Sequence, residues 1–168
     1  MKPFPRRLYT SFGDFWQDIR YIMQNRQRIK SAMRGDMISN KFRERLMLMV
    51  TEVNGCRYCS YYHAREALKA GISNDELEEL ISGTIPTSTP KDEYPALIYA
   101  QYWAEANAKP DPEIQQKLVD TYGVEKSEAI TVILHMIRVG NLSGNLWDYI
   151  LYRLSFGRWG LLKDETVH

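Results

Sequence analysis

The sequence has few cysteines, few glycines, almost no net charge and no long apolar run. A chain of 168 residues buries roughly 68–70% of its unfolded surface and holds a core without disulfides or a metal ion, so its 2 cysteines need a local explanation. With 10 glycines and 44% apolar residues, the composition excludes disorder. It describes one globular domain or two tightly packed lobes.

Charge and hydropathy also limit the partners. Lysine and arginine number 22 against 21 aspartates and glutamates, without a run of five like charges, which disfavours a nucleic-acid binder that neutralises phosphates. The most apolar windows, 46–50 and 130–139, are far shorter than the ~20 residues of a membrane span, and polar residues interrupt the basic N-terminus where a signal peptide stays apolar. We therefore expect a cytoplasmic protein whose partners are small molecules or proteins, with no nucleic acid and no membrane.

Apolar residues recur at helical spacing from end to end, and no segment has the alternation and turn of a hairpin. The sequence therefore predicts an all-α fold. The short apolar run 130–134 is compatible with a strand, but the lack of a partner strand favours a helix. The segments expected to be helical lie at about 12–33, 40–54, 56–70, 73–82, 95–106, 112–122 and 126–154, the last interrupted at Gly140 to Gly144.

Local signals define several ends of these helices. Ser39 is a plausible N-cap, Gly71 a left-handed C-cap, and Ser73 opens the capping box Ser-Asn-Asp-Glu. Gly35 is expected to end the first helix. The helix at 40–54 is apolar around most of its circumference, so we expect it to be central or at a subunit contact.

A loop rich in proline and threonine at 84–91 divides the chain into two parts. We expect a single domain over residues 1–168, with a motif-bearing region at about 40–83. A helical second half follows at about 92–156.

One segment, Val-Asn-Gly-Cys-Arg-Tyr-Cys-Ser-Tyr-Tyr-His at 53–63, indicates chemistry. At about 100° per residue, Cys56, Cys59 and His63 lie within roughly 60° of one another on a helix. If the helix begins after Gly55, Cys56 lies in its first turn, where free amides and the helix dipole favour a thiolate. Such positions and Cys-X-X-Cys spacing lower a thiol pKa from about 8.5 to about 3.5–7.5. His63, one turn after Cys59, can accept or return its proton, so the pattern favours dithiol redox chemistry.

Other interpretations of these residues stay open. Each cysteine taken singly fits a small buried hydrophobic residue. Two cysteines and a histidine also fit a metal site, whose fourth ligand would be Glu44, Glu52, His135 or water. A third possibility is a non-enzymatic, oligomeric redox sensor whose cysteine pair switches a partner surface.

The neighbouring polar and aromatic residues have ordinary interpretations as well. Glu44, flanked by two arginines, fits a solvated charged face, although either Glu44 or Glu52 can orient His63. His135, in an apolar helix, fits a core histidine whose hydrogen bonds are satisfied. The tyrosines of the segment fit packing, but Tyr58 lies between the cysteines and can donate a hydrogen bond or a proton.

Taken together, the stretch from Glu44 to His63 has a recognisable pattern. A glutamate stands twelve residues before the first cysteine, Asn-Gly directly precedes that cysteine, and Cys-X-Tyr-Cys-X-X-X-His leads into an alanine- and glycine-containing helix end. Over about thirty residues the pattern resembles the AhpD-like alkyl hydroperoxidase group of the carboxymuconolactone decarboxylase superfamily. The resemblance implies an all-α fold with a central Cys-X-X-Cys helix packed against a glutamate-bearing helix. It also implies assembly as a dimer, trimer or hexamer.

The resemblance further implies a dithiol peroxidase that reduces alkyl hydroperoxides without a cofactor. A lipoyl-bearing or thioredoxin-like donor would supply its electrons. Cys59 would attack the peroxide and Cys56 would resolve the sulfenic acid, with His63 and Glu44 as the proton relay. Tyr58 stands where the founding members carry histidine. The decarboxylase branch typically lacks the cysteine pair, so lactone decarboxylation is not expected.

Overall fold

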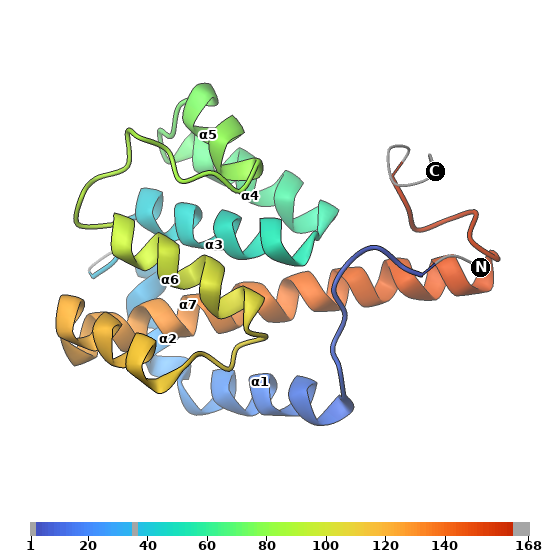
Figure 1. Cartoon of the computed structure of the whole chain (residues 1–168), viewed down its shortest axis with the longest axis horizontal. Coiled ribbons are helices and arrows are strands. Elements are labelled where there is room, and N and C mark those ends of the chain that lie inside the picture. Colours follow the sequence, from blue (N-terminus) through green and yellow to red (C-terminus); the bar gives the residue numbers. More distant parts are fainter. Residues whose placement is uncertain (1–2, 35–36, 163–168) are drawn as a thin grey trace.

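A computed structural model describes residues 3–34 and 37–162 of the chain (Figure 1). Helices are the regular structure in this described part, which contains no strand, so the predicted all-α fold is confirmed. Residues 130–134 are helical as expected. The helices are α1 (Phe12–Gln24), α2 (Arg26–Arg34), α3 (Asn40–Asn54), α4 (Arg57–Lys69), α5 (Asn74–Ile81), α6 (Tyr94–Glu105) and α7 (Pro112–Leu154).

Helix α3 lies at the centre and packs against α4, α5, α6 and α7 (Figure 1). The Ser39 hydroxyl accepts a hydrogen bond from the Phe42 N–H at 3.1 Å, which satisfies an N–H at the start of the helix. Gly55, in the left-handed conformation with φ 73°, ends it. The side chains from Leu46 to Thr51 are all buried, so the predicted central position of this helix is confirmed.

The long helix α7 runs across the whole molecule (Figure 1). It kinks at Gly123, where φ 73° and ψ 168° are not helical, and this is where the sequence predicted one helix to end. The predicted interruption at Gly140 to Gly144 is wrong, because the helix continues through both glycines. These glycines instead face α4: a Cβ on Gly144 would lie 2.9 Å from the Cys56 sulfur. Their small size allows close helix packing.

The segment expected as a single helix at 12–33 is two helices that meet at Asn25, where φ −104° and ψ 18° depart from helical values. The Asn25 backbone N–H bonds to the carbonyls of Tyr21 and Ile22, and its side-chain amide donates to the Tyr21 carbonyl at 2.9 Å. Asparagine thus offers the end of α1 local hydrogen bonds that compete with continuing the helix. Gly35, the expected end of that helix, lies outside the described residues.

A buried polar cluster ties the N-terminal helices to α7. Asp18 of α1 is 2% exposed and accepts hydrogen bonds from His135, Arg138 and Tyr9. The His135 ring also stacks on Tyr21, with centroids 4.0 Å apart. His135 is therefore the satisfied core histidine that its apolar surroundings predicted.

The remaining ends also follow their local signals. Gly71, with φ 90°, follows the last turn of α4, and the Ser73 hydroxyl accepts a hydrogen bond from the Glu76 N–H at 3.2 Å at the start of α5. Apolar side chains from both halves of the chain, among them Leu46 of α3, Leu97 of α6 and Ile133 of α7, belong to one hydrophobic cluster. The two halves therefore pack around shared contacts.

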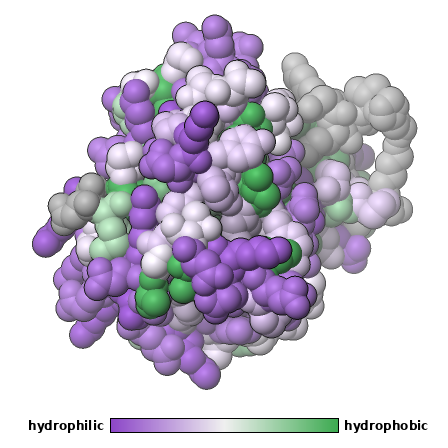
Figure 2. Space-filling view, turned by 60° about the vertical axis from the view of Figure 1, so that its left-hand side comes forward, coloured by the Kyte–Doolittle hydropathy of each residue, from purple (hydrophilic) through white to green (hydrophobic). Residues whose placement is uncertain are grey.

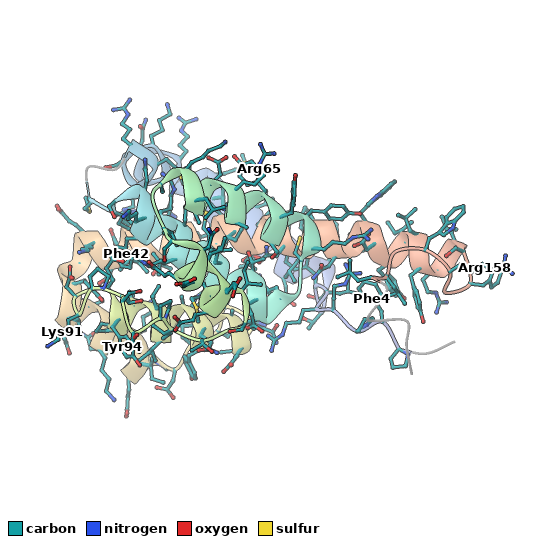
Figure 3. All side chains as sticks on the ribbon, turned by 90° about the horizontal axis from the view of Figure 1, so that it is seen from above. Phe4, Phe42, Arg65, Lys91, Tyr94 and Arg158 are labelled. Carbon is teal, nitrogen blue, oxygen red and sulfur yellow. The ribbon has the colours of Figure 1, made fainter. Side chains whose placement is uncertain are left out.

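The N-terminal segment runs beside the C-terminal part of α7, where Figure 3 places Phe4. The Phe4 ring meets Tyr149 edge to face, with centroids 5.5 Å apart. Two residues after Phe4, Arg6 lies against the turn at Gly55. A Cβ added to Gly55 would be 3.1 Å from the Arg6 side chain. The N-terminal segment thus reaches the cysteine-bearing turn.

The outer surface is mostly polar on the face shown in Figure 2, where hydrophobic residues form small separate spots. Every helix in the described ranges is too short or too polar to span a bilayer.

Candidate dithiol site

The two cysteines lie together where α4 begins. Cys56 is the N-cap residue, and Cys59 lies in the first turn with its N–H directed at the Cys56 sulfur at 3.4 Å. Both are free thiols, and their Sγ atoms are 2.8 Å apart. A disulfide needs roughly 2.05 Å between the sulfurs, so a small movement suffices to form the bond. Cys56 caps the helix instead of lying inside its first turn.

The surroundings place the first negative charge of the pair on Cys56. The hydrogen bond from the Cys59 thiol, the backbone N–H groups of Cys59 and Tyr58, and the charge of Arg6 lower the pKa of Cys56 to about 7 despite burial. The Cys59 thiol shares its proton with Cys56 and is largely buried, and both effects raise the pKa of Cys59. An interaction with the Asn141 side chain acts in the opposite direction. Above a pH of about 7 the pair therefore carries mainly one proton and one negative charge.

His63 and Glu44 form a hydrogen-bonded pair beside the thiols. The Glu44 Oε2 atom lies 2.8 Å from His63 Nδ1, and Glu44 is only 3% exposed. The interpretation of Glu44 as part of a solvated face is wrong, because α3 turns this residue inward toward α4. Glu52, the alternative partner, is exposed, and its carboxylate lies against Gly83 instead.

A pocket of about 240 Å³ opens onto Cys59. Its walls include His63 and Glu44 as well as the largely apolar side chains of Met47, Tyr62, Met136 and Ile137. Cys59 is partly exposed, whereas Cys56 is 1% exposed. Cys59 is therefore the sulfur that a small molecule in this pocket meets.

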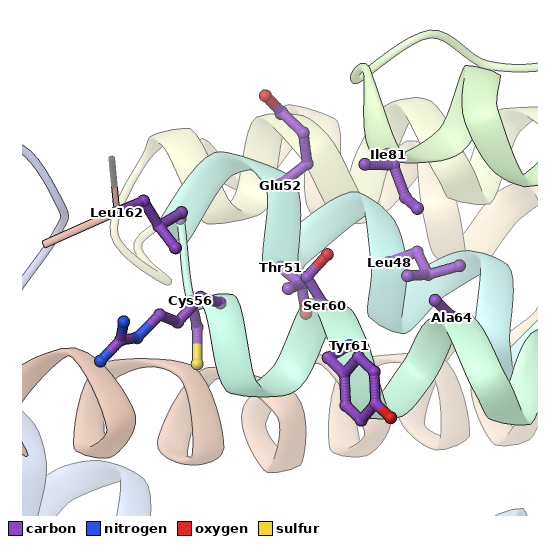
Figure 4. Close-up of a pocket in the computed structure, with 11 residues that line it drawn as sticks. Leu48, Thr51, Glu52, Cys56, Ser60, Tyr61, Ala64, Ile81 and Leu162 are labelled. Atoms are coloured by element: carbon purple, nitrogen blue, oxygen red, sulfur yellow. The ribbon is translucent and has the colours of Figure 1, made fainter. Parts of the chain in front are cut away.

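A larger cavity, about 500 Å³, lies on the other side of the N-terminal part of α4, between Leu48, Ile81 and Leu162 (Figure 4). In Figure 4 the Cys56 sulfur points away from these residues and toward α7. The short approach between that sulfur and Gly144 agrees with this orientation. The larger cavity therefore borders the backbone of the motif and not its sulfur atoms.

Tyr58 is held by polar contacts. Its hydroxyl donates a hydrogen bond to Asp148 at 2.7 Å and accepts one from Arg57 at 2.9 Å. Desolvation and the contact with Asp148 raise the pKa of Tyr58. Tyr58, Tyr61 and Tyr62 are 44%, 69% and 58% exposed, so they do not pack in the core, and Tyr58 is the hydrogen-bond donor that its place between the cysteines allowed. Tyr58 contacts Asp148 of α7, and Tyr62 lines the pocket at Cys59.

The sequence reasoning missed the groups that α7 and the N-terminal segment bring to the thiols. Asp148, fully buried, accepts from Arg6 at 2.5 Å and from Arg57 at 2.7 Å. On the same helix, Gly144 leaves room for the Cys56 sulfur, and Asn141 lowers the pKa of Cys59. The repeated Gly-Asn pairs at 140–141 and 144–145 were the available signal, since a four-residue spacing puts both pairs on one helix face.

Two of the side chains suggested as a fourth metal ligand lie apart from the thiols, whereas the third, Glu44, is hydrogen-bonded to His63. His135 bonds to Asp18, and Glu52 faces Gly83. Within the part of the chain that the structure covers, His, Cys, Asp and Glu side chains form no group of three that suits a metal ion.

The site can be compared with known proteins. No curated protein and no solved structure gives a significant match to the chain. The family model described as "Carboxymuconolactone decarboxylase family" matches residues 20–104, which is half of the chain and includes α3, α4 and α5. The chain therefore belongs to the carboxymuconolactone decarboxylase family, within the AhpD-like superfamily.

Proposed function

We propose that the protein is a thiol-dependent peroxidase that reduces alkyl hydroperoxides with the Cys56–Cys59 pair. One observation carries the proposal: two thiols lie 2.8 Å apart, and one of them opens onto a pocket that also contains the hydrogen-bonded His63 and Glu44. A nucleophile, a second thiol and a proton donor are thus close enough to act in sequence.

The first step oxidises Cys59. Passing the shared proton across the 2.8 Å contact to Cys56 leaves the thiolate on Cys59, the sulfur at the pocket. This thiolate attacks the terminal oxygen of the hydroperoxide, a sulfur–oxygen bond forms and the oxygen–oxygen bond breaks. The alkoxide takes a proton from His63, which Glu44 orients through its hydrogen bond, and leaves as the alcohol. Cys59 is then a sulfenic acid.

The second step closes the disulfide. Cys56 passes the proton that it took from Cys59 to His63, which gave up its own in the first step. The Cys56 thiolate, favoured by the N–H groups at the start of α4 and by the charge of Arg6, then attacks the sulfenic sulfur. A sulfur–sulfur bond forms, the sulfur–oxygen bond breaks, and hydroxide leaves as water after taking a proton. An external dithiol, lipoyl-bearing or thioredoxin-like, then returns two electrons and two protons.

Peroxide consumption with a dithiol donor tests the proposal. We expect the protein to consume tert-butyl hydroperoxide steadily with dihydrolipoamide or thioredoxin, and one equivalent of peroxide without donor to remove two hydrogens from the intact mass. The control is the folded double variant Cys56→Ser/Cys59→Ser. Consumption no faster than with this control contradicts the proposal. A disulfide that forms without turnover would favour the redox sensor.

Glu44→Gln is expected to slow turnover while the protein stays folded. The amide keeps the size of the side chain but replaces the carboxylate that orients the His63 ring, so kcat should fall about 10- to 100-fold, part of what general acid catalysis supplies. The measurement is kcat as a function of pH. Glu52→Gln, on the same helix but exposed and away from His63, is the matched control. Equal losses in the two variants would refute a specific role for Glu44.

A further inference from the structure

We propose that Asp148 is a positioning residue of the thiol site: its buried carboxylate fastens the cysteine-bearing turn to α7 and so keeps the two sulfurs in contact. The proposal deepens the peroxidase function proposed above and rests on it. Asp148 lies on α7, outside the segment 20–104 that the family model matches, so the family match assigns it no role.

The Asp148 carboxylate holds the residues that separate the cysteines. Its Oδ1 atom accepts one hydrogen bond from the Arg57 guanidinium and one from the Tyr58 hydroxyl, each at 2.7 Å. These are the two residues between Cys56 and Cys59. A change in the first turn of α4 that moves one sulfur away from the other would therefore break these bonds to α7.

The other carboxylate oxygen secures the turn before Cys56. The Oδ2 atom accepts a hydrogen bond from Arg6 at 2.5 Å. The Arg6 side chain lies against Gly55, because a Cβ added there would be 3.1 Å from its Cγ atom. Gly55 immediately precedes Cys56, and Arg57 immediately follows it. One carboxylate thus holds both neighbours of Cys56, the second directly and the first through Arg6.

Asp148 is itself charged and fixed in place. It is 0% exposed, and burial alone would raise its pKa, but the hydrogen bonds from Tyr58 and the two arginines lower that pKa. Hydrogen bonds to a charged acceptor are roughly twice as strong as those between neutral groups. The backbone at Gly160 packs directly on Asp148, since a Cβ on Gly160 would collide with the Asp148 carbonyl oxygen. The carboxylate therefore cannot follow partners that move away.

This clamp has a consequence for the redox chemistry. The sulfurs are 2.8 Å apart in the reduced protein, and a disulfide needs roughly 2.05 Å. When two reacting groups are already held close together, little further freedom is lost as the bond forms. Asp148 therefore speeds closure of the disulfide and favours the disulfide over the dithiol.

Glutathione provides a test that needs no peroxide. A protein thiolate attacks oxidised glutathione, forms a mixed disulfide and releases one glutathione thiolate. The second protein thiolate then attacks the protein sulfur, forms the Cys56–Cys59 bond and releases the other glutathione. Acid quenching and intact mass give the rate of this second step and the equilibrium constant. Asp148→Asn should slow closure about tenfold and shift the equilibrium about tenfold toward the dithiol, which corresponds to about 30 mV.

The rate also separates positioning from charge. In Asp148→Asn the positive charges of Arg6 and Arg57 remain while the negative charge is gone. Acting through charge alone, the two arginines would favour the Cys56 thiolate and speed closure at a slightly acid pH, below the pKa of Cys56. Slower closure at that pH is therefore the result that positioning predicts.

Asp18→Asn is the matched control. Asp18 is 2% exposed and, like Asp148, accepts hydrogen bonds from an arginine and a tyrosine hydroxyl, here Arg138 and Tyr9. Its bonds join α1 to α7 and leave α4 untouched. This variant should lose stability as Asp148→Asn does, without changing the rate of closure or the equilibrium.

A second variant covers the case in which Asp148→Asn does not fold, as judged by circular dichroism. Tyr58→Phe removes one of the three donors at a side chain that is 44% exposed, and it changes no charge. It should slow closure by a smaller factor. A native rate in Tyr58→Phe would then overturn the proposal.

Two results with folded Asp148→Asn overturn the role of Asp148: closure as fast as in the native protein or faster, or equal slowing in Asp18→Asn. Failure of the peroxidase proposal gives a different result. The native protein would then consume no peroxide, while glutathione would still close the disulfide and Asp148→Asn would still slow that closure.

Discussion

Cys59→Ser is expected to abolish both sulfenic acid formation and peroxide turnover, whereas Cys56→Ser consumes one equivalent of peroxide and then stops. The reason is access, because Cys56 is 1% exposed and Cys59 opens onto the pocket. The lower pKa belongs to Cys56, but a proton crosses a 2.8 Å contact readily, whereas a hydroperoxide cannot reach a covered sulfur. The measurement is peroxide stoichiometry, with the sulfenic acid trapped by dimedone and identified by mass.

The serine variants also decide between two orders of attack. If Cys56→Ser forms no sulfenic acid while Cys59→Ser consumes one equivalent, Cys56 is the attacking residue. The pKa order would then outweigh accessibility. In that case the turn at Gly55 must open before peroxide enters, since the closed structure covers Cys56 from the side of α7.

Features that depend on nearby residues were predictable from the sequence. The caps at Ser39 and Ser73 and the end of α4 before Gly71 depend on hydrogen bonds within a few residues, so their signals lie in consecutive letters. The proximity of Cys56 and Cys59 is equally local, since a three-residue step on one helix fixes it. The break at Asn25 also depends on local hydrogen bonds. Asparagine is tolerated inside helices, however, so the residue type alone did not predict the break.

Features that depend on contacts between distant segments were not predictable in this way. Glu44 has arginines on both sides, and only the packing of α4 on α3 shows that it faces inward. Arg6 and Asp148, which are hydrogen-bonded to each other near the thiols, are 142 positions apart in the sequence. The glycines of α7 were interpreted as an interruption of the helix, because the neighbouring residues do not show that the Cys56 sulfur lies beside Gly144.

Gly144→Ala is expected to reduce peroxide turnover about 100-fold, the loss that a displacement of about 1 Å causes in a reacting group. The added Cβ would lie 2.9 Å from the Cys56 sulfur and 3.4 Å from the Tyr58 ring, and the wall of α7 leaves the sulfur little room. Two terms of opposite sign act on the free energy of unfolding. Overpacking costs about 1–3 kcal/mol. Replacing a mid-helix glycine by alanine returns about 0.5–1 kcal/mol.

Because the cost exceeds the return over most of these ranges, Gly144→Ala should lose up to about 2.5 kcal/mol of unfolding free energy, and its thiols should no longer meet at the native distance. Gly140→Ala is the matched control, since its Cβ would lie at an ordinary 3.8 Å from the Cys59 sulfur. That variant should gain about 0.5–1 kcal/mol of stability and still close the disulfide. The measurements are urea unfolding and the rate of disulfide closure after one equivalent of peroxide. Native closure in Gly144→Ala would mean that α4 moves freely against α7, and that the glycine is not what sets the position of Cys56.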